Sequence, residues 1–210
     1  GGTCDNSDCE DGVRLYRRLL AGLPDKSAEL IEIGYLQVLA GFLESGPDDL
    51  SRSTGEELLK NKVKMLWVMG GNWEKDICGL ENNFCRNRRA SRGANTVVSR
   101  YPGEIRFLGF EAGKSVITHP PRDVKDPLYN AFCDHGSQNG RSSWDPMLVL
   151  AAAGDDVLAA SGYEAICGTA GVDPITGMNS FVPSSAGRHL YLKKTMPDDW
   201  LSSQIDNLIG

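Results

Sequence analysis

The stretch that decides the fold runs from Val63 to Phe84, and its first ten residues read VKMLWVMGGN. The first nine are mostly β-branched or large apolar residues closed by two glycines, which predicts a strand buried on both faces of a parallel sheet. A polar loop with Asn72, Glu81 and Asn83 follows. Ligands of open α/β sheets bind beyond the carboxyl ends of the strands, so this loop is a candidate binding site. Asn-rich loops are also ordinary turns, and the stretch alone leaves both interpretations open.

Composition places the chain among ordinary soluble globular proteins. It has 210 residues, of which 40% are hydrophobic and 24% charged, and its formal net charge is −6. This negative charge argues against a nucleic-acid partner, since no basic face offsets it. The longest apolar run, Met147–Ala153, is far shorter than the ~20 residues of a membrane helix, so we expect no membrane partner.

The N-terminus and the cysteines bear on processing and compartment. Gly1–Cys4 lacks an initiator Met and the features of a signal peptide, and we expect a processed or truncated product. Cys4 with Cys9, or Cys78 with Cys85, would close small loops in an oxidising compartment, whereas free buried thiols are an equal alternative. A secreted protein is favoured over a cytoplasmic one, and a homo-oligomer is compatible with the sequence.

Amphipathic helices and short apolar runs alternate along the chain. Helices are expected at 10–21, 35–45, 54–61, 86–100, 126–133, 142–153 and 197–208, and strands at 28–33, 63–71, 105–110 and 115–118, with two or three more between 162 and 192. Residues 111–113 are expected to be a turn. This alternation predicts a single α/β domain over residues 1–210, with a largely parallel sheet flanked by helices.

Four motifs follow one another in a recognisable order. They are Gly34-Tyr35-Leu36 at a strand-to-helix turn before the strand that ends Met69-Gly70-Gly71, Glu81-Asn82-Asn83 in the polar loop, Trp144-Asp145-Pro146 opening a late helix, and a tail from Val172 to Leu192. Together they resemble the inosine/uridine-preferring nucleoside hydrolase family. The resemblance implies a Rossmann-like fold and hydrolysis of the N-glycosidic bond of ribonucleosides, giving ribose and a free base. It also implies a bound Ca²⁺ that holds the attacking water.

The resemblance assigns roles around the sugar and the metal. Asp145 would be a calcium ligand, and the main-chain carbonyl of Gln37 a second one. Glu81, Asn83 and Asn72 would bind ribose hydroxyls. Carboxylate and carbonyl oxygens suit Ca²⁺, a hard cation that takes six to eight oxygen ligands.

The base-binding side is expected to be aromatic. Trp144 stands where many family members carry a histidine that acts on the leaving base. In having a tryptophan there, the chain resembles the purine-preferring members of the family. An indole can stack on a purine although it supplies no proton. His135, in the loop before Trp144, is a candidate proton donor, the alternative being an exposed loop histidine.

The aspartate-rich motif that opens the family is not found. Asp5, Asp8 and Asp11 lie at a helix start, where acidic residues are ordinary caps. The resemblance therefore implies a chain that lacks the first strand or strands. In one hypothesis a second polypeptide supplies the missing aspartates of a split enzyme. In a second, the chain is a degenerate homologue with a binding or structural role, and in a third an unrelated α/β module.

Overall fold

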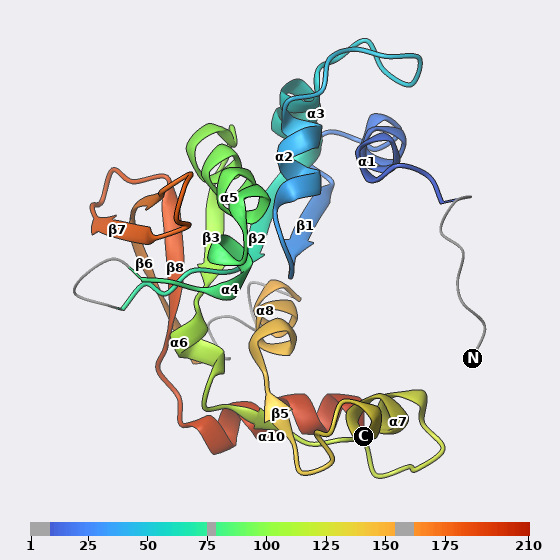
Figure 1. The fold of residues 1–210 in the computed structure, drawn as a ribbon, viewed down its shortest axis with the longest axis vertical. Coiled ribbons are helices and arrows are strands. Elements are labelled where there is room, and N and C mark those ends of the chain that lie inside the picture. The colour runs from blue at the N-terminus through green and yellow to red at the C-terminus, as the bar shows by residue number, and fades with distance from the viewer. Residues whose placement is uncertain (1–8, 75–78, 154–161) are drawn as a thin grey trace.

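The protein is built on a six-stranded mixed sheet (Figure 1), seen in a computed structural model that describes residues 9–74, 79–153 and 162–210. The strand order is β1-β2-β3-β8-β6-β7. Four neighbouring strands run parallel, and two antiparallel strands close one side. The parallel strands are β1 (Ala28–Glu32), β2 (Val63–Met69), β3 (Ile105–Leu108) and β8 (His189–Lys194), and the antiparallel ones are β6 (Tyr163–Val172) and β7 (Asn179–Pro183). The prediction of a largely parallel α/β sheet is confirmed.

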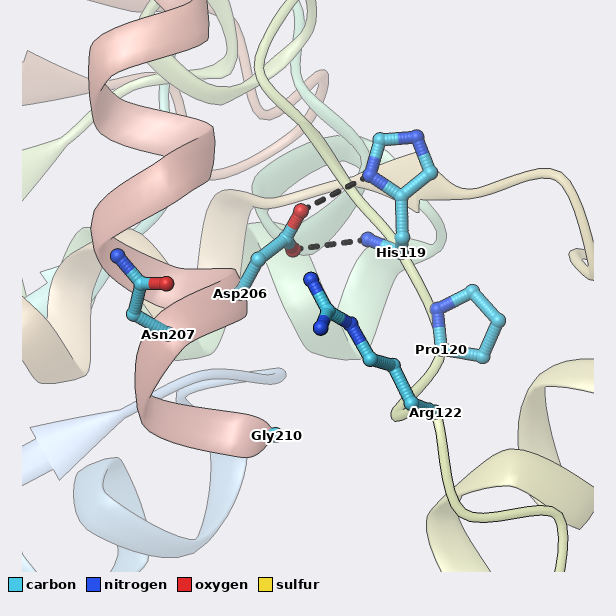
Figure 2. A pocket seen from close by; sticks show the side chains of 6 residues that line it. All are labelled: His119, Pro120, Arg122, Asp206, Asn207 and Gly210. Carbon is cyan, nitrogen blue, oxygen red and sulfur yellow. Dashed lines mark hydrogen bonds and ion pairs between the residues drawn. The ribbon is translucent and has the colours of Figure 1, made fainter.

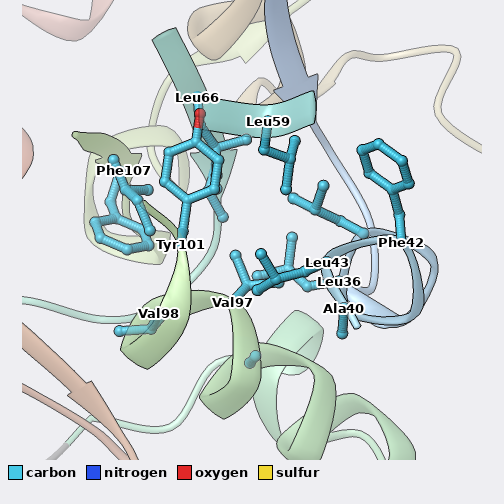
Figure 3. Close-up of a cluster of buried hydrophobic side chains, with 14 of the residues drawn as sticks. Leu36, Ala40, Phe42, Leu43, Leu59, Leu66, Val97, Val98, Tyr101 and Phe107 are labelled. Atoms are coloured by element: carbon cyan, nitrogen blue, oxygen red, sulfur yellow. The ribbon is translucent and has the colours of Figure 1, made fainter. Parts of the chain in front are cut away.

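Helices cover both faces of this sheet. On one face lie α1 (Gly12–Ala21), α2 (Gln37–Leu43), α3 (Gly55–Lys62) and α5 (Arg88–Arg100), whose apolar side chains form a core with Leu66 and Val68 (Figure 3). On the other face, Trp67 and Met69 pack against α8 (Trp144–Ala152) and α10 (Asp198–Ile209). Successive residues of β2 therefore point into two different cores, and the second half of β2 is buried on both faces as predicted.

A smaller group of elements lies at the end of the molecule where α10 runs (Figure 1). It contains a two-stranded ribbon of β4 (Ile117–Thr118) and β5 (Arg141–Ser142), together with α7 (Pro127–Asp134). The strand expected at 115–118 is thus shorter than predicted and pairs outside the main sheet. In the described part of the chain, no helix is long and apolar enough to cross a bilayer.

Two short helices lie in segments that were expected to be a turn, a loop or the end of a strand. The strand expected at 105–110 ends at Leu108, and α6 (Phe110–Gly113) follows where a turn was predicted. The Phe110 N–H donates to the Gly71 carbonyl at 2.8 Å, a tertiary hydrogen bond that joins the start of α6 to the turn after β2. Likewise the polar loop contains α4 (Asn82–Cys85), because Glu81 caps it by accepting from the Asn83 N–H at 2.8 Å.

Candidate functional site

The carboxyl end of β2 turns sharply at Gly70 and Gly71. A Cβ at Gly70 would lie 2.4 Å from the Phe84 ring, and Gly71 has a φ of +84°, a conformation that favours glycine. Both positions therefore need glycine. The turn lets α4 approach the end of the strand, and it places Glu81 and Asn83 beside Met69.

A cavity of about 220 Å³ opens at this end of the sheet. It brings together four of the predicted site residues from two distant parts of the chain, namely Glu81, Asn83, Trp144 and Asp145. The remaining lining residues are Ile33, Met69, Asn82, Phe110 and Arg141. The cavity thus lies beyond the ends of β1 and β2, where an open α/β sheet places its ligands.

Glu81 is the buried acid of this cavity, with 5% of its surface exposed. Its Oε1 accepts from the Asn83 N–H at 2.8 Å and its Oε2 from the Gly71 N–H at 3.2 Å. Burial raises the pKa of the Glu81 carboxyl, these N–H groups oppose that rise, and the nearby charge of Asp145 adds to it. Two main-chain donors therefore fix this carboxyl group in one orientation at the cavity wall.

Asn83 and Asp145 complete the polar wall. The Asn83 amide donates to the Met69 carbonyl at 3.0 Å, which fixes its plane. Asp145 lies in the first turn of α8 and is half-buried. Burial raises the pKa of its carboxyl, and the Arg141 guanidinium opposes that rise.

Trp144 and Phe110 form the aromatic wall. Their rings stack with centroids 5.5 Å apart and planes 24° apart, and the indole N–H donates to the Phe110 carbonyl at 2.8 Å. A Cβ at Gly113 would lie 2.5 Å from the Trp144 ring, so glycine permits this close packing. The indole N–H is already bonded, which leaves Trp144 suited to stacking on a ligand.

The other three predicted residues do not line the cavity. Asn72 is held through its main chain, which donates to and accepts from the Asn179 side chain at 3.1 and 3.0 Å. Gln37 begins α2 and lies against Gly93 of α5. His135 is exposed, and its Nε2 lies 2.7 Å from Nη1 of Arg141, so it meets the cavity only through that side chain.

Sequence reasoning missed two residues that shape the site. Phe110 stands in what was expected to be the end of a strand, and Asn179 lies in a turn-rich segment far along the chain. Each residue acts through a contact with a distant segment, and no local sequence pattern predicts such a contact. The one available signal for Phe110 is its position directly after a glycine at the carboxyl end of a parallel strand.

The described residues do not form a complete calcium site. Among residues 9–74, 79–153 and 162–210, no group of three or more His, Cys, Asp or Glu side chains is placed to hold a metal ion. Asp145 and Glu81 lie close enough for their charges to interact, but two carboxylates fall short of the six to eight oxygens that Ca²⁺ takes. Any calcium here would need ligands beyond these two.

Two further cavities lie toward the small group of elements. The larger, of about 600 Å³, is lined by His119, Arg122 and Asp206, among others, and Figure 2 shows the bonds between His119 and Asp206. It contains no residue predicted for the site. A cavity of about 300 Å³ adjoins the candidate site and shares Arg141, Trp144 and Asp145 with it.

The fold is similar to a solved structure, an inosine-uridine preferring nucleoside hydrolase from Bacillus anthracis, with a TM-score of 0.54 and 16% sequence identity. The chain has a nucleoside hydrolase-like fold. The match covers 94% of this chain and 66% of that enzyme, so this chain spans slightly less than two thirds of the enzyme's length. No protein family and no curated protein matches the sequence.

Cysteine pairing is described only in part. Cys133 and Cys167 are free thiols. Both expected disulfides include a residue outside the described part, Cys4 in one case and Cys78 in the other.

Proposed function

We propose that this chain supplies the sugar- and base-binding part of an N-ribosyl hydrolase, which splits ribonucleosides into ribose and a free base. The observation that supports this most is the meeting of Glu81, Asn83, Trp144 and Asp145 around one cavity. Two carboxylates, an amide and a stacked indole are the groups that a ribonucleoside needs, because its sugar offers hydroxyls and its base offers a flat apolar face.

The polar wall suits both binding and cleavage. Ribose hydroxyls would donate to Glu81 and Asp145, and the fixed Asn83 amide would hold a third polar atom. Cleavage of a glycosidic bond passes through an oxocarbenium-like state with positive charge on the sugar. Negative oxygens held in place around the sugar stabilise that charge.

The aromatic wall suits the base. Trp144 is backed by Phe110 and cannot use its N–H for the base, so it would act by stacking. A purine offers a larger face than a pyrimidine and is therefore the favoured base. Another group must protonate the leaving base. His135 is the candidate, and its loop would have to move inward past Arg141 to reach the base.

We further propose that a second polypeptide supplies the carboxylates that a Ca²⁺ ion would need beside Asp145, since Gln37, the other expected ligand, lies away from the cavity. The incomplete ligand set is one support. The other is β1, which in the described part of the chain has no strand on its outer side. Ile31 on this strand is 40% exposed, and Ile33, directly after the strand, is 48% exposed and lines the cavity. A strand added parallel to β1 would end beside the cavity.

Binding of inosine, measured by calorimetry, tests the sugar-binding role. The Glu81→Gln variant keeps an oxygen for capping α4 but loses the charge, so we expect its affinity to fall at least about tenfold, or ~1.4 kcal/mol. Glu104→Gln, which alters an exposed ion pair with Arg106, should bind like the wild type. Equal affinity in the Glu81→Gln variant would contradict the proposed role of this carboxyl group.

A binding protein without catalysis is the second candidate function. The incomplete metal site and the bonded indole N–H favour it. The two candidates separate when the native species is purified, its intact mass is measured, and base release from inosine is followed. A companion polypeptide with base release supports the split enzyme. A single component that binds inosine without releasing base supports the binding protein.

A further inference from the structure

Three side chains hold the turn that follows β2. The N–H groups of Gly71, Asn72 and Trp73 are consecutive donors, and each has a side-chain acceptor. The acceptors are Glu81 at 3.2 Å, Asn179 at 3.1 Å and Glu111 at 3.2 Å. Two of these three acceptors are carboxyl groups from different elements, so this one turn joins α4 to α6.

Glu111 lies behind the cavity, next to Phe110 on α6. The Phe110 N–H donates to the Gly71 carbonyl at 2.8 Å, so α6 is fixed to the turn by its main chain as well as by the Glu111 side chain. Phe110 in turn carries Trp144 by stacking and by a hydrogen bond. The contacts therefore run without a gap from Glu81, through the turn and Glu111, to the aromatic wall.

We propose that Glu111 is a positioning residue of the site: its carboxyl group holds the aromatic wall of Phe110 and Trp144 against the polar wall of Glu81 and Asn83. Its Oε1 makes the bond to the turn. Its Oε2 is buried and has no hydrogen-bond partner within the described residues. An unpartnered buried oxygen costs free energy, and that cost is larger when the group is charged. The charge state of Glu111 therefore affects how firmly the two walls are held.

The surroundings of Glu111 disfavour its charge. The titratable groups that face it are Glu74 after the turn, Glu81 beside α4 and Tyr191 on β8, none of them a cation. The neighbouring Lys114 lies over the Phe110 ring. Burial, with a smaller contribution from Glu74 and Glu81, raises the pKa of the Glu111 carboxyl to about 7. Glu81 and Glu111 accept from the same turn. The neutral form of Glu111 adds no charge beside Glu81, whereas the ionised form adds a negative one.

Trp144 fluorescence tests the proposal without any ligand. At each pH, the spectrum of the Trp144→Phe variant is subtracted from that of the otherwise identical protein with Trp144, which isolates the Trp144 signal. We expect a transition near pH 7 in the wild type and none in Glu111→Gln, which keeps an acceptor for the Trp73 N–H but cannot ionise. Circular dichroism and urea unfolding establish that the variant folds. Glu74→Gln removes an exposed charge near Glu111 and should keep the transition.

An unchanged transition in folded Glu111→Gln would overturn the proposal. Inosine affinity adds a second readout, which rests on the proposed function. The affinity of the wild type for inosine should fall about threefold or more between about pH 6 and about pH 8. One linked proton allows a change of up to about tenfold per pH unit. For Glu111→Gln it should stay level. If inosine binds neither protein, the proposed function fails, while the fluorescence result still decides the role of Glu111.

Discussion

His189 is a buried histidine kept neutral inside the sheet. Its Nδ1 accepts from the Ala170 N–H at 2.9 Å, so the ring proton lies on Nε2. That nitrogen is buried and has no hydrogen-bond partner within the described residues, and the ring packs edge-on against Phe107. Burial, with the charge of Arg188, lowers the pKa of His189 to about 4. The Val98 main chain favours the charged ring and opposes this shift only in part.

Acid should therefore destabilise the protein through His189. In the unfolded chain the histidine takes up its proton near its ordinary pKa of about 6.5, whereas the folded protein resists until about pH 4. Its contribution to stability is complete above pH 6.5 and is lost as pH falls from there toward 4. Between pH 7.5 and 5 this loss should be about 2 kcal/mol.

Urea unfolding of wild type and His189→Gln at both pH values measures this loss as a difference. Taking the difference cancels the pH-dependent contributions of the carboxyl groups, which are the same in both proteins. The control is His119→Gln, which alters an exposed pair with Asp206. Between pH 7.5 and 5 its free energy of unfolding should fall about as much as that of the wild type. A His189→Gln variant with the full wild-type loss would refute the assignment.

The sequence singled out four residues that line the cavity, but it did not reveal the contacts that hold them in place. Glu81, Asn83, Trp144 and Asp145 belong to short motifs whose order could be compared with a known family. Glu111 and Asn179 act through bonds to the turn after β2, and Asn179 is 107 residues away from Asn72. Such contacts depend on tertiary packing, which local patterns do not record.

Gly55 sets how closely two helices pack. It begins α3, and a Cβ there would lie 1.7 Å from the Phe42 carbonyl oxygen of α2. Helix propensity favours alanine over glycine by about 1 kcal/mol. The clash is with rigid main chain, however, and α2 is held by buried side chains such as Leu39 and Leu43.

We expect Gly55→Ala to reduce the free energy of unfolding by about 3 kcal/mol or more, because the main-chain clash outweighs the gain in propensity. Gly46→Ala is the matched control, since a Cβ there meets no atom within 4 Å. It should leave stability nearly unchanged. Urea unfolding of both variants gives the comparison, and equal stabilities would show that α2 and α3 can separate without cost.

Elements with a clear period were predicted well, and the shortest ones were not. The long helices and the strands β1, β2 and β3 follow hydrophobic spacing, and their ends lie within a few residues of prediction. The helices α4 and α6 have four residues each, barely one turn, so no period can reveal them. At α4 the preceding residue, Glu81, accepts from the Asn83 N–H, and at α6 the distant Gly71 carbonyl accepts from the Phe110 N–H.

At the scale of the whole molecule, the exposed edge of β1 is the feature that most calls for a partner. Replacing Ile31 with lysine puts a charge on this edge, which opposes pairing with a further strand. We expect Ile31→Lys to cost less than about 1 kcal/mol of the chain's own stability, because the side chain is 40% exposed, and yet to abolish assembly with the proposed companion polypeptide.

Native mass spectrometry of the chain mixed with its purified companion measures this assembly. Leu208→Lys is the control, since Leu208 is 73% exposed on α10 and far along the chain from β1. It should assemble like the wild type. Assembly of Ile31→Lys at wild-type affinity would show that the partner docks elsewhere.

The bond between Asn72 and Asn179 also has a kinetic consequence. Asn179 pairs with Gly79 as well, so two segments about a hundred residues apart in sequence must meet before the turn after β2 is fixed. Closing so long a loop is entropically costly and slows folding. The strands β1, β2 and β3 pair with segments nearer in sequence, whereas the turn after β2 is fixed only once Asn179 has docked. We therefore expect this end of the cavity wall to take its final shape late in folding, after β1, β2 and β3 have paired.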